Sequence, residues 1–260
     1  MDLKNKAIVI VGGSTGLGFS AAQACCEAGA RVVIVGRSPD SLEHAQQTLG
    51  QNCLSHQGDA SLPETSVAAI QSCLRTFGGF DGLYHVAGGS GRKWGDGPLH
   101  EITDEAWDQT LHWNLNSVFF SNRAAIRSFL DRSLPGSIVN MSSVLAFSPS
   151  PHHFASHAYA AAKSAIIGMS RASASKYAPN SIRINVIAPA LVDTPMATRA
   201  CKNESIQRFI SSKQPLDGGR VGHPSDAASA VVYFLSDASN FVTGQVLSID
   251  GGWQLSEGQV

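Results

Sequence analysis

The chain has 260 residues, of which 43% are hydrophobic and 15% charged, and this composition is typical of a folded globular protein and not of a disordered one. Its 19 lysines and arginines nearly balance its 20 aspartates and glutamates, and no Lys/Arg cluster is present, so we expect no nucleic-acid partner. The length suits one α/β domain, and we assign residues 1–260 to it.

The apolar segments are short. The first, 7–11, is too short for a signal-peptide core or a membrane span and is followed at once by glycines. We therefore expect a cytoplasmic protein without membrane contacts. The five cysteines include no CxxC pair; adjacent Cys25 and Cys26 could sense redox state, but small buried apolar side chains are the simpler interpretation.

Short apolar segments alternate with longer amphipathic ones along the whole chain. We expect strands at 7–11, 32–35, 53–56, 82–86, 137–141, 182–187 and 246–249. We expect helices at 18–28, 41–49, 63–77, 105–130, 158–177 and 225–236. Most of these strands are rich in β-branched residues, as in parallel strands covered on both faces, whereas the more polar third strand is placed mainly by its spacing. The alternation predicts a Rossmann-like, doubly wound parallel sheet in a single α/β domain.

A glycine-rich segment joins the first expected strand to the first expected helix, and it reads Val11-Gly12-Gly13-Ser14-Thr15-Gly16-Leu17-Gly18. Glycines let the backbone turn tightly and approach a pyrophosphate, while the helix N-terminus supplies free N–H groups and a positive dipole end. A glycine triplet alone is a weak signal in a chain with 25 glycines. This triplet lies between the first expected strand and the first expected helix, and that position makes it a much stronger signal. It predicts a dinucleotide-binding loop; the alternative is a structural strand–helix turn.

The cofactor's ribose is expected to lie near the end of the second strand. An acidic residue there would bind the ribose 2′-hydroxyl, whereas an arginine accommodates a 2′-phosphate. Arg37 follows this strand, and Asp40 lies at an expected helix start, where it is better interpreted as a cap. We therefore favour NADP(H), and NAD(H) remains open if Arg37 is solvated or stacks on adenine. Asp59 and Ala60 follow the third strand, and Asp59 either accepts a hydrogen bond from the adenine amino group or caps the next helix.

Two loops interrupt the alternation of strands and helices. The first, 88–98, is glycine-rich, and the second, 193–224, contains a short polar helix near 203–212. Loops beyond the carboxyl ends of parallel strands are where such sheets bind ligands. The second loop is long enough for a mobile lid over a substrate, and the alternative is an ordinary surface excursion.

Tyr159 and Lys163 stand four residues apart on an expected helix, which places them on the same face. A tyrosine has an ordinary pKa of about 10, and a neighbouring ammonium is expected to lower it. Upstream, a strand ends at Ser142 and Ser143, and a hydroxyl there could hold a substrate oxygen beside Tyr159; we favour Ser143. Asn114, within a helical stretch, either fixes a water linked to Lys163 or is a kink or packing feature.

These segments together resemble the short-chain dehydrogenase/reductase family over essentially the whole chain. The matching residues are Gly12, Gly16 and Gly18; Asp59; Ala87 and Gly88; Asn114; Ser143; Tyr159 and Lys163; Asn185, Ala188 and Pro189; Val192 and Thr194; and Asp250, Gly251 and Gly252. The sequence departs from the family at Val11, where a threonine is usual, at His85 and Val86, where two asparagines are usual, and at Ala190, where a glycine is usual.

The resemblance implies hydride transfer with Tyr159 as general acid–base. Lys163 would lower the pKa of Tyr159 and hold the nicotinamide ribose, Ser143 would orient the substrate oxygen, and Asn114 would assist a proton relay. Residues expected to bind the cofactor are Gly12, Ser14, Thr15, Gly16, Leu17, Gly18, Arg37, Asp59, Ala60, Ala87, Gly88, Tyr159, Lys163, Pro189, Val192 and Thr194. Relatives pair their two long helices, which implies a homodimer or homotetramer.

Three histidines, His152, His153 and His157, lie in the segment before Tyr159, which is slightly long for the family. No carboxylate or cysteine joins them at a ligand-like spacing, so we expect no metal; they line the substrate entrance or lie on the surface.

The leading hypothesis is an NAD(P)(H)-dependent oxidoreductase, with NADP(H) favoured, that interconverts a ketone or aldehyde and its alcohol in a small-molecule substrate. An enoyl reductase is not favoured, since such relatives usually separate the tyrosine and lysine more widely. The alternative from another class is a catalytically silent dinucleotide-binding regulator of the same fold.

Overall fold

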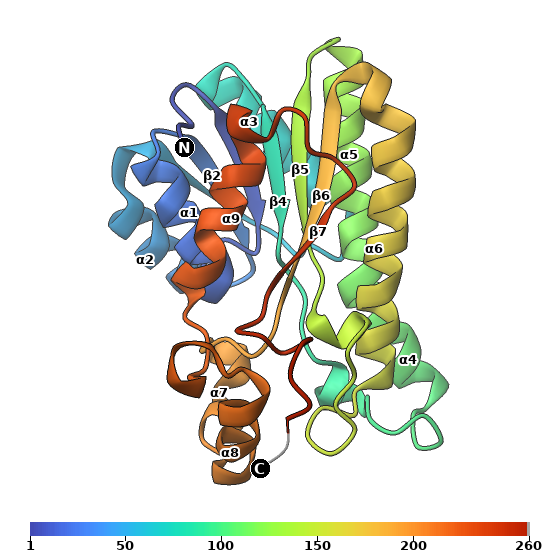
Figure 1. Ribbon diagram of the computed structural model, residues 1–260. Coiled ribbons are helices and arrows are strands. Elements are labelled where there is room, and N and C mark those ends of the chain that lie inside the picture. The colour runs from blue at the N-terminus through green and yellow to red at the C-terminus, as the bar shows by residue number, and fades with distance from the viewer. Residues whose placement is uncertain (259–260) are drawn as a thin grey trace.

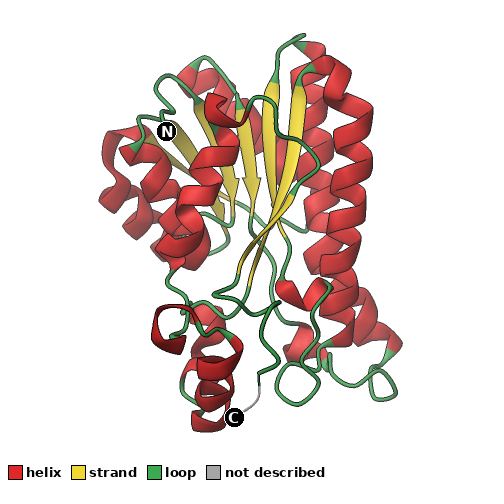
Figure 2. Ribbon diagram, viewed as in Figure 1, coloured by secondary structure: helices red, strands yellow, loops and turns green. Residues whose placement is uncertain are grey.

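The computed structural model describes residues 1–258. Seven parallel strands form one sheet, with helices on both faces (Figures 1 and 2). The strand order is β3-β2-β1-β4-β5-β6-β7. The strands are β1 Ala7–Val11, β2 Arg31–Gly36, β3 Cys53–Gln57, β4 Gly82–His85, β5 Gly136–Met141, β6 Ile182–Pro189 and β7 Val246–Ile249. All seven expected strands are present within two residues at either end, including β3, and the single α/β domain is confirmed.

The helices follow the expected alternation. The α-helices are α1 Gly16–Glu27, α2 Pro39–Leu49, α3 Pro63–Phe77, α4 Asp104–Leu111, α5 Ser117–Asp131, α6 His157–Tyr177, α7 Thr198–Cys201, α8 Glu204–Lys213 and α9 Pro224–Leu235. Short 3₁₀ turns are η1 Gly50–Asn52, η2 Gly91–Trp94, η4 Val144–Ala146, η5 Ala178–Asn180, η6 Pro195–Ala197, η7 Leu216–Gly219 and η8 Asp237–Ser239. Among residues 1–258, no helix is both long and apolar enough to cross a membrane.

The single helix expected over 105–130 is the one expected element that the structure contradicts. It is divided into α4, a π-helical turn η3 at His112–Asn116, and α5. The side chain of Asn114 donates to the carbonyl of Thr110 at 2.9 Å, and the hydroxyl of Ser117 donates to the carbonyl of Trp113 at 2.7 Å. Side chains that bond carbonyls one turn earlier compete with the backbone ladder, which favours a local π turn.

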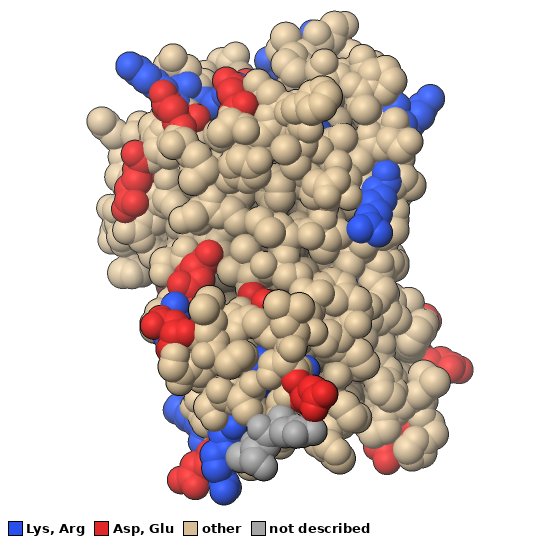
Figure 3. All heavy atoms as spheres, viewed as in Figure 1, with Lys and Arg blue, Asp and Glu red and all other residues tan. Residues whose placement is uncertain are grey.

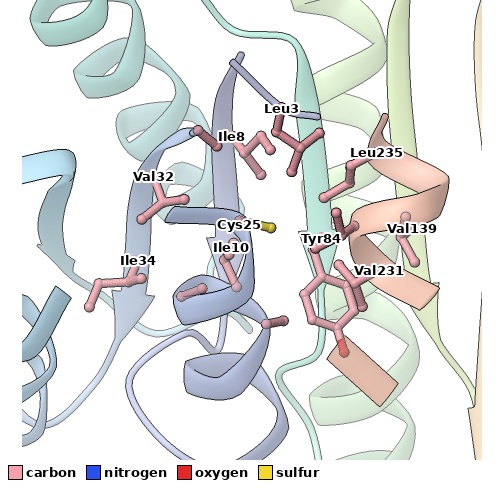
Figure 4. Close-up of a cluster of buried hydrophobic side chains, with 14 of the residues drawn as sticks. Leu3, Ile8, Ile10, Cys25, Val32, Ile34, Tyr84, Val139, Val231 and Leu235 are labelled. Atoms are coloured by element: carbon pink, nitrogen blue, oxygen red, sulfur yellow. The ribbon is translucent and has the colours of Figure 1, made fainter. Parts of the chain in front are cut away.

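The core divides into two clusters, one on each face of the sheet, because alternate side chains of each strand point in opposite directions. In β1, Ile8 and Ile10 pack toward α1 and α9, and Val9 and Val11 pack toward α3, α5 and α6. Figure 4 shows part of the first cluster, in which Ile8 and Ile10 of β1 lie close to Cys25 of α1, with Val231 and Leu235 of α9 in the same cluster. Both faces of the sheet are therefore covered, as parallel strands require.

Cysteines contribute to these cores as expected. Cys25, Cys53 and Cys73 are buried and free, and Cys26 and Cys201 are half-buried. Burial raises the pKa of Cys53 and of Cys73 to about 12, so these thiols stay protonated and unreactive at neutral pH.

A third, smaller cluster lies beyond the carboxyl ends of the strands, where α7 and α8 project from the sheet (Figure 1). Trp253, from the segment after β7, is its largest buried side chain. Its ring lies edge-on to Phe154 at 5.9 Å and to Phe209 of α8 at 5.7 Å, and its indole N–H donates to the carbonyl of Ser148 at 3.2 Å. The C-terminal segment thus joins α8 to the loop before α6.

Candidate active site

A cavity of about 490 Å³ lies at the carboxyl ends of the strands. The strand order places it where connections leave the sheet in opposite directions, between β1 and β4, which is the usual ligand site of open α/β sheets. The glycine-rich loop lines one end of the cavity, and Ser143, Tyr159 and Lys163 line the other. On the face shown in Figure 3, basic and acidic side chains are interspersed without a large patch of either sign.

The glycine loop needs its glycines for space as well as for conformation. Gly12 has φ +93°, and a Cβ there would lie 2.7 Å from the backbone nitrogen of Ala87. A Cβ on Gly18 would lie 1.9 Å from the carbonyl oxygen of Gly12. Gly16 has φ +53° and lies against Thr194, so the loop after β1 meets the loop after β6.

The N-terminus of α1 is open toward the cavity. Thr15 occupies the N-cap position, but its side chain makes no capping hydrogen bond, and the first turn holds no acidic residue. The first N–H groups of the helix and its positive dipole end are therefore left for an anion. This arrangement fits the pyrophosphate of a dinucleotide.

Arg37 and Asp59 lie at the glycine-loop end of the cavity. Arg37 is exposed, and its guanidinium lies 5.6 Å from the ring centroid of Trp113 in η3. Asp59 accepts hydrogen bonds from the backbone N–H and hydroxyl of Ser61 at 2.9 and 2.7 Å. Burial raises the pKa of Asp59, but the Ser61 hydrogen bonds and the charge of Arg37 outweigh it and leave that pKa below its usual value.

Neither Asp40, which we expected to be a helix cap, nor Asp59, for which capping was one of two alternatives, occupies an N-cap position. Ser38, not Asp40, is the N-cap of α2 and accepts from the backbone N–H of Ser41 at 3.3 Å, while Asp40 lies in the first turn. Asp59 bonds Ser61 in the loop before α3 and does not cap that helix, whose N-cap is Leu62. A hydroxyl directly before Pro39 can take the β-region dihedrals of a cap, which a residue inside the first turn cannot.

Tyr159, Ser143 and Lys163 come together at the other end. The hydroxyls of Ser143 and Tyr159 share a hydrogen bond. The ammonium of Lys163 lies 5.5 Å from the ring centroid of Tyr159 and donates to the carbonyl of Met141, the last residue of β5, at 3.0 Å. Ser142 has a different role: its hydroxyl donates to the carbonyl of Lys163 at 2.8 Å, which ties α6 to the end of β5.

The electrostatics of Tyr159 correct one expectation. Burial raises the pKa of Tyr159 to about 12, and the hydrogen bond from Ser143 lowers it only in part. Burial also lowers the pKa of Lys163 to about 8. Lys163 does not lower the pKa of Tyr159 here, because its ammonium lies over the ring rather than against the phenolic oxygen, and desolvation disfavours both charged forms. Tyr159 is thus a neutral phenol with a proton to give at neutral pH.

Asn114 is fully buried, and both its side-chain oxygen and its side-chain nitrogen form hydrogen bonds with the backbone. It accepts from the N–H of Gly89 at 2.9 Å and donates to the carbonyls of Gly89 and Thr110, both at 2.9 Å. Gly88, with φ +145°, lies beside it: a Cβ on Gly88 would be 2.7 Å from Oδ1 of Asn114 and 3.6 Å from Nζ of Lys163. Asn114 therefore braces the loop after β4 directly beside Lys163, which favours the packing role over the water-binding one for its side chain.

His85 replaces the usual asparagine brace. Its ring lies 2.7 Å from the hydroxyl of Ser121 and 3.2 Å from the carbonyl of Ala87. Burial, together with the charge of Lys163, lowers the pKa of His85 to about 3, so the ring is neutral. The strand end that carries Ala87 and Gly88 is thus fixed by a histidine in this chain.

The remaining expected residues lie on the cavity wall. Pro189, Val192 and Thr194 line it from β6 and the loop that follows, as do Ser14, Leu17, Ala60 and Ala87. Of the three histidines, His152 and His157 are exposed, and His153 packs against Phe209 at 4.9 Å between ring centroids. Within the described chain, 1–258, no three His, Cys, Asp or Glu side chains are placed to hold a metal ion.

Sequence reasoning missed Asp96, which lies in the glycine-rich loop 88–98. Its buried carboxylate accepts from the backbone N–H groups of Ala158 at 2.9 Å and Tyr159 at 3.0 Å, at the start of α6. The partners are 62 and 63 residues apart, and no local pattern marks the pairing. The only signal was an acidic residue, between two glycines, in a loop already expected to border the site.

Comparison with known proteins agrees with this geometry. Residues 11–254 match the family model described as enoyl-(acyl carrier protein) reductase. The chain is 32% identical to the 2,5-dichloro-2,5-cyclohexadiene-1,4-diol dehydrogenase of Sphingobium indicum, over 97% of this chain and 98% of that protein. It is 35% identical to the 3-oxoacyl-(acyl-carrier-protein) reductase of Chlamydia trachomatis, over 96% of this chain and 98% of that protein.

Solved structures show the same architecture. A short-chain type dehydrogenase/reductase from Mycobacterium ulcerans superposes with a TM-score of 0.90 at 30% identity, covering 98% of this chain and 92% of that one. The 3-ketoacyl-(acyl-carrier-protein) reductase from Brucella melitensis, solved in complex with NADH, superposes with a TM-score of 0.85 at 26% identity, covering 97% of this chain and 99% of that one.

Proposed function

The chain belongs to the short-chain dehydrogenase/reductase family of oxidoreductases, and we propose that it interconverts a ketone or aldehyde and the corresponding alcohol, with NADP(H) preferred over NAD(H). The observation that carries the proposal is one cavity with an open helix N-terminus at one end and the hydrogen-bonded pair of Ser143 and Tyr159 at the other. In this proposal the dinucleotide binds at the first end and the carbonyl compound at the second.

Each residue at the proton-handling end then has a defined task. Ser143 orients the carbonyl oxygen, and Tyr159 donates its proton to that oxygen during reduction and accepts it back during oxidation. The dinucleotide supplies or accepts the hydride when bound. Lys163, held by Met141, keeps a positive charge beside the ring of Tyr159 and is in position to hold the nicotinamide ribose. Asn114 keeps the loop at Gly88 and Gly89 in place beside that ammonium.

Residues at the other end bind the dinucleotide in this proposal. Gly12 to Gly18 and the N-terminus of α1 hold the pyrophosphate, Asp59 and Ala60 border the adenine, and Pro189, Val192 and Thr194 border the nicotinamide. The preference for NADP(H) rests on Arg37, which lines the cavity directly after β2, in the position where an acidic residue would bind a ribose hydroxyl.

Three further features complete the proposal. The segment 193–224, with α7 and α8, acts as a lid beyond the carboxyl ends of the strands. The long helices α5 and α6 pair between subunits in a homodimer or homotetramer. Five free cysteines, three of them buried, support a cytoplasmic location.

A second candidate, reduction of an enoyl thioester, is favoured only by the description of the family model. The three-residue interval between Tyr159 and Lys163 favours the carbonyl reaction. A catalytically silent dinucleotide-binding protein gains no support, since the relatives are named dehydrogenases and reductases.

A substrate panel tests the proposal. Purified protein is assayed with NADPH and NADH against ketones, aldehydes, 3-oxoacyl thioesters and enoyl thioesters, with identification of the product. We expect alcohols from carbonyl compounds, at a higher kcat/KM with NADPH. Saturated thioesters as the only products would replace the proposal with the second candidate.

A further inference from the structure

The substrate end of the cavity carries two arginines and no acidic side chain. The charged residues that line the whole cavity are Arg37, Asp59, Arg92, Lys163 and Arg199. Arg37 and Asp59 belong to the glycine-loop end. Lys163 donates to the carbonyl of Met141 and lies over the ring of Tyr159. Arg92 and Arg199 remain, and the proposed function gives neither a task.

The two arginines come from different walls of the cavity. Arg92 lies in η2, in the loop after β4, and Arg199 lies in α7, in the segment after β6. Burial lowers the pKa of Arg92, the charge of Arg199 lowers it further, and the charge of Asp96 raises it. The carboxylate of Asp96 is itself held by the backbone N–H groups of Ala158 and Tyr159. No ion pair holds either arginine within residues 1–258, and the one hydrogen bond from the Arg92 guanidinium goes to the carbonyl of His153 at 3.2 Å. Two cations that line one cavity and make no ion pair among the described residues form a site where an anion is stabilised.

Arg92 is also fixed relative to Tyr159. Its neighbour Gly91 is buried so tightly that a Cβ there would lie 2.0 Å from the hydroxyl oxygen of Thr110. At the other end of the same loop, Asp96 accepts the backbone N–H of Tyr159 at 3.0 Å. The position of the Arg92 backbone is therefore set with respect to the group that would protonate the substrate.

We infer that the substrate carries an anionic group, such as a carboxylate, that Arg92 and Arg199 bind together while the carbonyl oxygen lies against Ser143 and Tyr159. The inference rests on the proposed function and narrows its substrate class to oxo acids and the matching hydroxy acids. Leu145, Phe154 and Trp253 give the cavity apolar lining, which suits the carbon skeleton of such a substrate.

The diphosphate of the dinucleotide is the other source of an anion in this cavity. The two sources predict different losses. If the arginines hold the substrate, their replacement lowers affinity for oxo acids alone; if they hold the diphosphate, it lowers affinity for NADPH whatever the substrate.

The test compares oxo acids with their neutral amides. Pyruvate, acetoacetate and levulinate, in which the carboxylate is progressively further from the carbonyl, are each assayed beside the corresponding amide, using wild type, Arg92→Gln, Arg199→Gln and Arg92→Lys with NADPH. Arg208→Gln is the matched control, an exposed arginine on α8 that does not line the cavity. Binding of each acid and amide to the complex with NADP⁺ is measured by calorimetry as a readout that needs no turnover.

We expect the wild type to prefer at least one acid over its amide by about tenfold to a hundredfold in kcat/KM, the range of a charge-assisted hydrogen bond. In each Gln variant the ratio of kcat/KM for the acid to that for the amide should fall about tenfold, with amide kinetics and NADPH affinity unchanged. Arg92→Lys should keep part of the preference for the acid. Arg208→Gln should match wild type. Equal kcat/KM for acids and amides would overturn the inference and leave the proposed function standing. Loss of NADPH affinity in the Gln variants with an unchanged acid-to-amide ratio would assign the anion to the dinucleotide and also overturn it.

Failure of the proposed function gives a different pattern. If no carbonyl compound is reduced, the calorimetric comparison still decides the inference: acid binding that exceeds amide binding and depends on Arg92 and Arg199 supports an anion site, and equal binding removes it.

Discussion

The carboxylate of Asp96 accepts the backbone N–H of Tyr159 at 3.0 Å and that of Ala158 at 2.9 Å. A loop that borders the substrate end of the cavity thereby caps the helix that carries the proton donor. A negative charge at a helix N-terminus is favourable, and here it also removes two backbone donors that would otherwise be buried without partners. Positioning of Tyr159 and shaping of the pocket depend on the same side chain.

Replacement of Asp96 should therefore affect both stability and turnover. Asp96→Ala leaves two N–H groups without an acceptor, so we expect a loss of about 1–3 kcal/mol in the free energy of unfolding. Asp96→Asn keeps one acceptor oxygen and should lose less. Denaturant titrations measure the stability, and kcat should fall more than NADPH affinity because the proton donor shifts. Asp108→Asn, an exposed acid on α4, is the control and should be silent.

The pKa of Lys163 predicts a pH dependence of stability. Burial lowers this pKa from 10.5 to about 8 in the folded protein. Between pH 8 and 10.5 the unfolded chain therefore binds more protons at Lys163 than the folded protein does. Below pH 8 the buried ammonium destabilises the fold by about 3 kcal/mol, at 1.36 kcal/mol per pKa unit. This penalty decreases as the pH rises and is gone above 10.5.

The variant Lys163→Met isolates this effect from other titrating groups. Its free energy of unfolding should exceed that of wild type by the largest margin below pH 8, and the margin should disappear by about pH 10.5. A margin that is constant with pH would show that Lys163 keeps its ordinary pKa in the folded protein.

The glycines of the loop after β1 predict a steric effect on dinucleotide binding. A Cβ on Gly18 would lie 1.9 Å from the carbonyl oxygen of Gly12, so Gly18→Ala must displace the loop. We expect NADPH affinity to fall by at least about tenfold, measured by fluorescence titration, with a strain cost of about 1–3 kcal/mol. Gly168→Ala is the matched control: Gly168 is exposed on α6 with no atom near its Cβ position, so the change should stabilise the protein by about 0.5–1 kcal/mol.

Arg37 predicts the cofactor preference. Arg37→Ala should raise KM for NADPH by about tenfold or more and leave KM for NADH nearly unchanged, because only the 2′-phosphate loses its partner. A parallel loss with both cofactors would mean that Arg37 acts on a part that they share, such as the adenine.

Much of this architecture could be predicted from the sequence because its signals are local. The apolar, β-branched strands and the glycine loop between β1 and α1 are encoded over a few residues each. Even the polar edge strand β3 followed from spacing. Tyr159 and Lys163 were predictable as a pair because four residues on one helix fix their relationship.

Other features depend on contacts between distant segments, which no local pattern reports. The two hydrogen bonds between Asn114 and the backbone of Gly89 form only when the loop after β4 folds against the π turn. The same holds for the hydrogen bonds of Asp96 to α6 and for the presence of Arg92 and Arg199 in one cavity. The pKa of Tyr159 could not be predicted from its distance to Lys163 along the helix, because burial dominates that pKa.

Tyr159→Phe tests the central claim most directly, because it removes one oxygen and keeps the ring. The account predicts that kcat for carbonyl reduction with NADPH falls by about a hundredfold to ten-thousandfold, the usual contribution of a general acid, while NADPH affinity and unfolding midpoint stay close to those of wild type. Equal rates of NADPH oxidation by wild type and Tyr159→Phe across the carbonyl panel would contradict it.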